Sequence, residues 1–362
     1  MRSYKRIVIK VGTKVITSRE RTLDTGRIKE LVEQIASIQD KGAKVILVTS
    51  GAIGAGMGLL GLRRRPAKLS ELQATASIGQ NHLMQVYAGN FKDCGYLAGQ
   101  ILLTQEDFND RNRYLNIRYT LETLLAHDAV PVINENDTVS TEEIKCGDND
   151  RLASLVADVA QADLLVLLTD VDGLLDAEGK VIAIVDGINA KVQKLARMTS
   201  CDLGTGGMAT KLEAAARAAS AGIQCVIANG RKKDVLLDIV KGEMVGTSFK
   251  SGKAHFIAKK RWIAFSSRPK GAVLVDGGAH EALSKKDRSL LASGIIAVEG
   301  DFRAGDVIRV ADNDGKEFAR GLSNYSSSEL SKIKGLKTGQ IKAALGYKKE
   351  DEVVHKDNLV VL

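Results

Sequence analysis

Side chains that build metal clusters, disulfide frameworks and histidine-based active sites are scarce in this sequence. Its 362 residues include four cysteines and five histidines. The cysteines lie far apart, without C-x-x-C or Cys/His spacing, so we expect free thiols and no zinc site. The histidines are scattered, and no His/Ser or His/Cys constellation stands out. We therefore predict no metal ion held directly by side chains and no histidine-assisted nucleophile.

Long apolar runs are also missing. No stretch approaches the roughly 20 apolar residues that a membrane helix needs. The first residues, MRSYKRIVIKVGTK, contain neither an apolar signal region nor a small-residue cleavage site. With 44% hydrophobic and 27% charged residues, the composition is typical of a globular protein. We expect a cytoplasmic protein with no membrane partner, long enough for two domains.

The excess of basic residues is confined to one segment. The formal net charge is +8, yet residues 1–249 and 271–362 are nearly balanced, whereas residues 250–270 contain seven Lys or Arg and no Asp or Glu. Such a cluster can mark a polyanion-binding surface, but it is more often a solvated connector. The single tryptophan, Trp262, would anchor this connector to a domain. We expect no nucleic-acid partner.

The order of the expected elements predicts two domains. Apolar strands alternate with helical segments through residues 1–255, which predicts an α/β domain with a mostly parallel sheet sandwiched by helices. A basic linker, residues 256–270, follows. Residues 271–355 contain short strands separated by Gly and Asp turns, which predicts a small, mainly β, barrel-like domain.

Two strand ends near the N-terminus have features of an anion-binding site. Lys10 lies in an apolar strand, and a buried cation needs a partner, which at a strand's carboxyl end could be a phosphate. A snorkelling surface lysine is the alternative. The next buried strand runs into Ser50, Gly51 and Ala52 before a helix of small residues. Such a turn exposes backbone N–H groups to an anion.

The stretch richest in polar side chains is PVINENDTVSTEEIKCGDNDRLA, residues 131–153. It opens from a short apolar strand into Asn134, Asp137, Asp148, Asn149 and Asp150. No periodicity of 2 or 3.6 runs through these residues, so we predict a loop after a strand, where α/β folds bind ligands. The loop could hold a small charged molecule, or Mg²⁺ through its water shell. A solvated, turn-rich loop is the alternative.

Two further stretches suit a nucleotide. One apolar strand ends at Thr169 and Asp170. Residues 203–230 predict a glycine-rich loop, a helix that begins near Met208 with Lys211 in its first turn, and another strand. Glycine N–H groups, a helix N-terminus and a lysine together suit polyphosphate. A flexible loop before a surface helix is less favoured, because a lysine at a helix start opposes the helix dipole.

Common nucleotide and cation motifs do not explain these features. GMGLLG (56–61) matches G-x-G-x-x-G but does not follow a strand directly, so we do not expect a Rossmann dinucleotide site. No G-x-x-x-x-G-K-[ST] motif is present. DVDG (170–173) lacks the further acids of a calcium loop.

Six motifs together carry a resemblance to a known family. IVIKVGT, VTSGAIGAG, PVINENDTV, KCGDND, LLTDVDGL and GTGGMATK occur in the order and at the spacing of the amino acid kinase family. The chain resembles that family along essentially its whole length, and in particular its glutamate-phosphorylating members, which carry a basic connector and a C-terminal PUA domain.

The resemblance implies an activity and its partners. The enzyme would use ATP and Mg²⁺ to phosphorylate the γ-carboxylate of L-glutamate, giving L-glutamyl 5-phosphate in the first step of proline biosynthesis. Feedback inhibition by proline and a homo-oligomer, dimer or tetramer, are also implied. An ionised carboxylate is its own nucleophile, which agrees with a chain that has no histidine-based site.

The resemblance also implies roles for single residues. The catalytic residues would be Lys10, Lys211 and Asp150, the aspartate that holds both lysines. The glutamate site would contain Ser50, Gly51, Ala52, Asn134, Asp137, Asp148 and Asn149. ATP would be bound by Lys10, Gly12, Thr169, Asp170, Thr205, Gly206, Gly207, Met208, Ala209, Thr210 and Lys211. Asp137 is the natural partner of the substrate ammonium group, whereas a turn cap is the alternative for Asp148.

Two alternatives stay open. Another amino acid kinase, acting on aspartate, acetylglutamate or uridylate, would share the fold, but the NENDTV and GDND motifs and the PUA-like tail argue against it. An RNA-binding protein is the second, because PUA domains occur in RNA-modifying enzymes. The balanced charge of the tail argues against tight polyanion binding.

Overall fold

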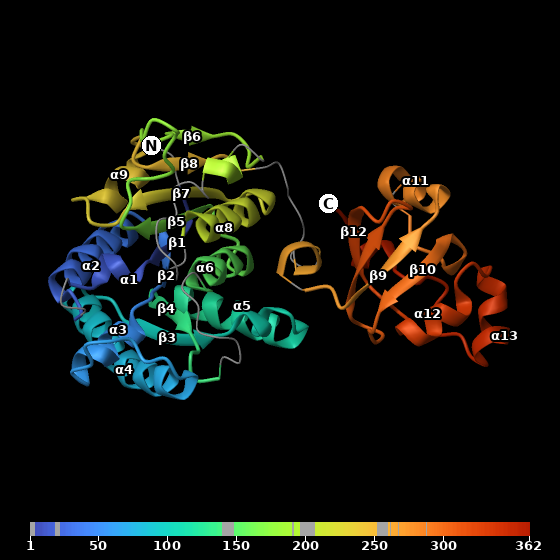
Figure 1. The fold of residues 1–362 in the computed structure, drawn as a ribbon, viewed down its shortest axis with the longest axis horizontal. Helices are drawn as coiled ribbons and strands as arrows, with labels where there is room; N and C mark the ends of the chain where they lie inside the picture. Colours follow the sequence, from blue (N-terminus) through green and yellow to red (C-terminus); the bar gives the residue numbers. More distant parts are fainter. Residues whose placement is uncertain are drawn as a thin grey trace. The chain divides into compact units, whose positions relative to one another are not determined.

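The computed structural model describes most of the chain as two compact units. The described residues are 4–18, 22–139, 148–189, 192–195, 207–251, 260, 262–266, 268–286 and 288–362. The chain divides into Met1–His255 and Phe256–Leu362, and Figure 1 shows a sheet with its own helices in each unit. Three predicted site features lie outside the described residues: Thr205, Gly206 and the side chain of Asp148.

The N-terminal unit is built on an eight-stranded sheet with the order β3-β4-β2-β1-β5-β7-β8-β6. Its strands are β1 (Arg6–Val11), β2 (Lys44–Val48), β3 (Ala98–Leu103), β4 (Val130–Glu135), β5 (Leu164–Thr169), β6 (Ile184–Val185), β7 (Gln224–Asn229) and β8 (Thr247–Phe249). Neighbours from β3 to β7 pair in parallel, and β7 pairs with β8 in antiparallel. The predicted mostly parallel sheet is therefore confirmed.

Helices cover both faces of this sheet, with α2, α4 and α9 on one face and α5, α6 and α8 on the other (Figure 1). The helices are α1 (Thr13–Ile16), α2 (Thr25–Asp40), α3 (Ala52–Leu59), α4 (Leu69–Asp93), α5 (Arg111–Ala126), α6 (Asp148–Val159), α8 (Met208–Ser220) and α9 (Val235–Lys241), with a 3₁₀ turn η1 (Gln105–Phe108). In α2, Ile28, Leu31 and Ile35 form a buried apolar stripe. Asp24 caps this helix by accepting the backbone N–H of Arg27.

Side-chain alternation along β1 decides where Lys10 points. Ile7, Ile9 and Val11 belong to the apolar core formed with α2 and α4. Successive side chains of a strand point to opposite faces of a sheet. Lys10 therefore points to the other face, where α6 packs against β1.

The structure corrects the predicted polar loop at both ends. Asn134 still belongs to β4, and Asp148, Asn149 and Asp150 form the first turn of α6. Short acidic and amide side chains favour a helix N-terminus, because its free N–H groups and dipole attract them. The stretch without periodicity thus spans the end of a strand and the start of a helix, as well as the chain between them.

Helices α3 and α4 pack with their backbones in contact. A Cβ atom added at Gly56 would lie 1.9 Å from the carbonyl oxygen of Thr75, and one added at Gly79 would lie 1.8 Å from that of Ala52. No side chain fits at these distances, so both positions need glycine. The contact fixes α4 against Ala52, the first residue of α3.

The C-terminal unit has its own sheet and core. Its sheet has the order β10-β9-β11-β12-β13 and is mostly antiparallel. The elements are β9 (Gly271–Val275), α11 (Gly277–Lys286), η3 (Ala292–Gly294), β10 (Ile295–Gly300), β11 (Val307–Ala311), β12 (Glu317–Leu322), α12 (Ser327–Ile333), η4 (Thr338–Gln340), α13 (Ile341–Leu345), η5 (Lys356–Asn358) and β13 (Leu359–Val361). Trp262 is buried in a short helical turn, η2 (Trp262–Ser266), and Arg320 of β12 donates to the carbonyl of Ala264 at 2.8 Å. The only tryptophan therefore packs with this unit.

Candidate active site

Polar side chains gather where the carboxyl ends of the parallel strands meet. Thr49 and Ser50 follow β2 directly, Asn134 lies near the end of β4, and Thr169 ends β5. Strand β1 pairs with β2 on one side and with β5 on the other, so the chain order reverses there. Ligands of open α/β sheets bind at such a switch point.

Two lysines and one aspartate form the most strongly charged buried cluster of this edge. Lys10 Nζ lies 2.6 Å from Asp150 Oδ1, and Lys211 Nζ lies 3.1 Å from Asp150 Oδ2. The three residues come from β1, α6 and α8 and are only 5%, 0% and 6% exposed, respectively. With one carboxylate between two ammonium groups, the cluster carries one net positive charge. A buried cluster with a net positive charge suits an anionic ligand.

The pKa shifts in this cluster follow from burial and from the three charges. Burial opposes ionisation of Asp150, but Lys10 and Lys211 outweigh it and hold the pKa of this carboxyl below its usual value. For Lys211, burial lowers the pKa, the Asp150 carboxylate opposes that shift, and the charge of Lys10 adds to it. The arrangement therefore favours the ionised form of Asp150 and makes Lys211 less basic than a free lysine.

The start of α8 adds hydrogen-bond donors beside the cluster. The Thr210 hydroxyl lies 2.8 Å from Asp150 Oδ2 and 3.0 Å from the carbonyl oxygen of Gly207. Gly207 is the N-cap residue of α8 and provides no side-chain cap to the first N–H groups. Met208 and Ala209 begin the helix. An uncapped helix N-terminus next to two lysines is a suitable seat for phosphate oxygens.

Close packing also explains Gly12. Its N–H donates to the carbonyl of Leu168 at 3.1 Å. A Cβ atom at this position would lie 3.1 Å from that same oxygen and 3.6 Å from Lys10 Nζ. A larger residue would therefore occupy space beside the lysine ammonium group, whereas glycine leaves it open.

The turn after β2 is built on a glycine in a left-handed conformation. Gly51 has φ +99°, which few other residues adopt, and serves as the N-cap of α3. Ala52 starts the helix, so the backbone N–H groups of this turn lie at a helix N-terminus. Ser50 is buried, and its Oγ accepts a hydrogen bond from Asn149 Nδ2 at 3.0 Å.

A chain of amide side chains extends from this serine to α4. Asn149 Nδ2 also donates to Asn134 Oδ1 at 3.1 Å, and Asn134 Nδ2 donates to Gln80 Oε1 at 2.7 Å. The structure thus brings Ser50, Asn134 and Asn149 together as a connected group.

Asp137 lies half-buried in the turn after β4, where Thr138 contacts Ser77 of α4 at 3.2 Å between the hydroxyl oxygens.

Thr169 and Asp170 lie on the other side of β1. Lys14 Nζ contacts Asp170 Oδ2 at 3.0 Å, and Thr169 Oγ1 donates to Asp170 Oδ1 at 3.2 Å. Burial raises the pKa of Asp170, but its hydrogen bond with Lys14 and the other hydrogen bonds of this carboxyl bring the pKa below its usual value. Arg231 fixes this corner by donating to the carbonyls of Lys14 and Thr17.

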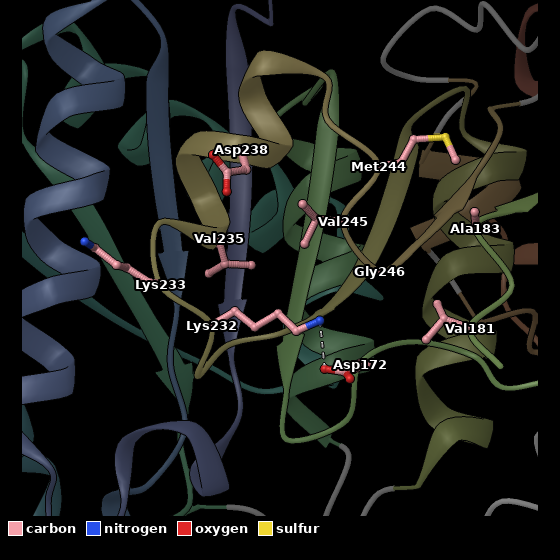
Figure 2. A pocket seen from close by; sticks show the side chains of 10 residues that line it. All are labelled: Asp172, Val181, Ala183, Lys232, Lys233, Val235, Asp238, Met244, Val245 and Gly246. Atoms are coloured by element: carbon pink, nitrogen blue, oxygen red, sulfur yellow. Dashed lines mark ion pairs between the residues drawn. The ribbon is translucent and has the colours of Figure 1, made fainter. Parts of the chain in front are cut away.

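A pocket of about 340 Å³ opens on the same side. It combines apolar side chains with charged ones, and is lined by Asp172, Val181, Ala183, Lys232, Lys233, Val235, Asp238, Met244, Val245 and Gly246. Figure 2 shows the Lys232 ammonium group reaching Asp172, at 3.1 Å. Asp172 follows β5 and Val245 precedes β8, so the pocket lies at the same edge of the sheet as Thr169. Apolar walls with a few polar groups are typical of a small-molecule site.

The described residues provide no ready-made metal cage. Among them, no group of three or more His, Cys, Asp or Glu side chains could hold a metal ion. Two carboxylates of this edge are already paired, Asp150 with two lysines and Asp170 with Lys14. This donor set fits Mg²⁺ that is held mainly by nucleotide phosphates and water.

Within the described part of the chain, no helix is both long and apolar enough to cross a membrane.

Sequence reasoning missed three residues that the structure adds to the site: Lys14, Gln80 and Arg231. Lys14 follows the Gly12 turn and could have been found as a second cation near a strand end. Gln80 follows Gly79 in the middle of α4, and a glycine inside a helix signals close packing there. No sequence signal identifies Arg231, because its contacts with the carbonyls of Lys14 and Thr17 span more than 200 residues.

Comparison with known proteins identifies the family of the chain. The sequence profile of the amino acid kinase family matches residues 5–229, and that of the PUA domain matches residues 271–345. The chain belongs to the amino acid kinase family.

Its relatives narrow the class further. The chain is 50% identical to the glutamate 5-kinase of Caldanaerobacter subterraneus subsp. tengcongensis, over 99% of this chain and 98% of the relative. It is 47% identical to the glutamate 5-kinase of Thermoanaerobacter sp. (strain X514), over the same shares. The glutamate 5-kinase of Pelobacter propionicus is 44% identical over all of this chain and 98% of its own. Within its family, the chain is therefore similar to glutamate 5-kinases from end to end.

Proposed function

We propose that the chain transfers the γ-phosphoryl group of ATP to the γ-carboxylate of L-glutamate, forming L-glutamyl 5-phosphate for proline biosynthesis. The observation that carries the proposal is the buried cluster of Lys10, Asp150 and Lys211 at the switch point of the sheet. Its net positive charge suits a transferring phosphoryl group. The end-to-end similarity to glutamate 5-kinases supports glutamate as the acceptor.

The acceptor needs no general base. A glutamate side chain has a pKa of about 4.3 and is ionised at neutral pH, so its oxygen can attack phosphorus directly. The enzyme must then bring two anions together in line and neutralise the charge on the transferring oxygens. Lys10 and Lys211 would do this from two elements, and Asp150 would fix both ammonium groups.

Glutamate would lie on the β2 and β4 side of the cluster. Ser50 and the backbone N–H groups of Gly51 and Ala52 would receive a carboxylate, and Asn149 would fix Ser50. Asp137 is the residue proposed for the α-ammonium group, and Asn134 for orienting Asn149. Asp148, at the start of α6, belongs to the same proposal by its position.

ATP would lie on the β5 and β7 side. Gly12, Thr169, Asp170 and the segment from Thr205 to Lys211 would hold its phosphates, with the N-terminus of α8 behind them. The pocket between Asp172 and Val245 would take the nucleoside end. Mg²⁺ bound to the phosphates would help neutralise the negative charge of the transferring oxygens. Asp150 and Asp170 could contact its water shell.

Three properties extend the proposal. Proline, which shares the α-amino acid group, would compete for part of the glutamate site. Inhibition by proline that does not weaken as the glutamate concentration rises would contradict this.

A homo-oligomer would form through the N-terminal unit, because β3 is an edge strand and the adjacent Leu97 is 71% exposed. A single species of monomer mass in sedimentation velocity would argue against it. Finally, the chain would work in the cytoplasm, and fractionated cells should show it there.

The proposal is tested by acyl phosphate formation. With ATP and Mg²⁺, hydroxylamine should trap a hydroxamate with L-glutamate, but not with L-aspartate, N-acetyl-L-glutamate or UMP. ADP release should match the hydroxamate formed. Turnover with another acceptor would assign a different member of the family, and no turnover with any acceptor would reject the kinase proposal.

A further inference from the structure

The amide chain described above has a fixed direction. Asn134 Oδ1 accepts the backbone N–H of Glu135 at 2.9 Å and also Asn149 Nδ2 at 3.1 Å. A backbone N–H can only donate, so the Asn134 oxygen and nitrogen are assigned without ambiguity. Its Nδ2 must then donate, and Gln80 Oε1 must accept. One backbone N–H thus sets the orientation of three amide side chains.

This direction leaves one donor and one acceptor unused. Gln80 Nε2 and Asn149 Oδ1 are both buried, and neither has a hydrogen-bond partner among the described residues. Buried polar groups are normally paired, and an unpaired one is costly. An α-amino acid carries both matching groups, a carboxylate to accept from Gln80 and an ammonium group to donate to Asn149.

We infer that Gln80 is a further substrate-binding residue, whose Nε2 donates to the α-carboxylate of the amino acid. The inference rests on the proposed function. The γ-carboxylate must reach the cluster around Lys10 on β1, whereas Gln80 contacts Asn134 on β4, and β2 lies between these strands. The end of the substrate that lies toward Gln80 is therefore the α end.

The position of Gln80 is rigid enough for this role. It follows Gly79, whose backbone is in contact with Ala52, so α4 and the Ser50–Ala52 turn are held together. Gln80 would thus fix the distance between its own donor and the N–H groups of that turn. A side chain on a rigid helix can favour one length and shape of amino acid over others.

Two variants and a matched control test the inference in the full chain. Gln80→Glu keeps an acceptor for Asn134 but replaces the donor with an acceptor, and Gln80→Met removes both at similar length. Gln85→Glu makes the same change on an exposed position of α4. KM for glutamate should rise about 10- to 100-fold in both Gln80 variants, with KM for ATP within about two-fold. The Gln85 variant should match wild type.

A second measurement separates direct contact from loss of structure. The inhibition constant of 4-aminobutyrate, which is glutamate without its α-carboxylate, should change less than about three-fold in the Gln80 variants. An equal loss for glutamate and 4-aminobutyrate, or for glutamate and ATP, would overturn the inference, as would unchanged kinetics. If the wild-type chain formed no hydroxamate from glutamate, the proposed function would fail first and this assignment with it.

Discussion

Replacing Asp150 with asparagine should make the buried cluster of Lys10, Asp150 and Lys211 a source of instability. The substitution keeps the shape of the side chain but leaves two buried ammonium groups without their counter-charge. The repulsion between these two ammonium groups is already present in the wild type, so the substitution removes their attraction to Asp150. Removing one partner of a buried ion pair costs about 3–5 kcal/mol. One lysine could instead lose its proton, which at pH 7 costs at most about 5 kcal/mol. The free energy of unfolding should therefore fall by about 3–5 kcal/mol.

The stability deficit of Asp150→Asn should change with pH in a defined direction. A buried lysine with a lowered pKa binds its proton less readily in the folded state than in the unfolded state. Stability then rises with pH between the folded pKa and the unfolded value of about 10.4. The deficit of the Asp150→Asn variant should shrink as the pH rises from 7 toward 10. The deficit should also shrink below about pH 4. There the unfolded wild type binds a proton at Asp150 more readily than the folded wild type, in which the pKa of Asp150 is lowered, so the wild type loses stability.

Urea unfolding followed by far-ultraviolet circular dichroism would measure the deficit. Trp262 is the only tryptophan and packs in the C-terminal unit. Its fluorescence therefore reports the unfolding of the unit that does not contain the substitution. The matched control is Asp128→Asn, which removes an exposed partner of Lys44 and should cost less than about 1 kcal/mol. A deficit below 1 kcal/mol for Asp150→Asn, or one that does not change with pH, would refute the reasoning.

Three further changes should separate the roles of other residues. Asp137→Ala should raise the KM for glutamate at least ten-fold and leave that for ATP nearly unchanged in steady-state assays; an equal loss for both would reject the ammonium-binding role. Lys211→Ala should lower kcat by about 100-fold or more with little change in the glutamate KM, and single-turnover assays would locate the loss in phosphoryl transfer. Gly79→Ala should destabilise the fold by about 3 kcal/mol, because its Cβ meets the Ala52 carbonyl, whereas Gly89→Ala, with open space around it on the same helix, should stabilise it by about 0.5–1 kcal/mol. If the two glycine variants unfolded alike, the close packing of α3 and α4 would be wrong.

The parallel sheet and the two buried lysines could be predicted because each has a local signature. Apolar strands alternate with amphipathic helices, and a lysine inside an apolar strand demands a counter-charge. The strand position alone favours a phosphate as the partner of Lys10, whereas the family resemblance implies Asp150, whose Oδ1 lies 2.6 Å from Lys10 Nζ in the structure. Both are consistent, because a cluster with a single carboxylate still has one positive charge to offer.

Other parts of the site could not be predicted from local patterns. The sequence pattern predicts Asn134 and Asn149 in one loop, but they lie on a strand and a helix that meet only in the folded sheet. Gln80 has the neighbours of an ordinary helix residue, and its role depends on hydrogen bonds to a strand more than 50 residues away. Local propensity contains no information about such contacts, since they are created by the order of the strands.

The central place of β1 has a consequence for how activity is lost. Both of its edges are hydrogen-bonded, to β2 and to β5, and its inward side chains are fully buried. Backbone amides in such a strand exchange with solvent only when the whole unit opens. The role proposed for Lys10 depends on that strand, so catalysis in increasing urea should disappear together with the slowest-exchanging amides and not before them. The rate of phosphoryl transfer is thus also a gauge of the global folding equilibrium of this unit.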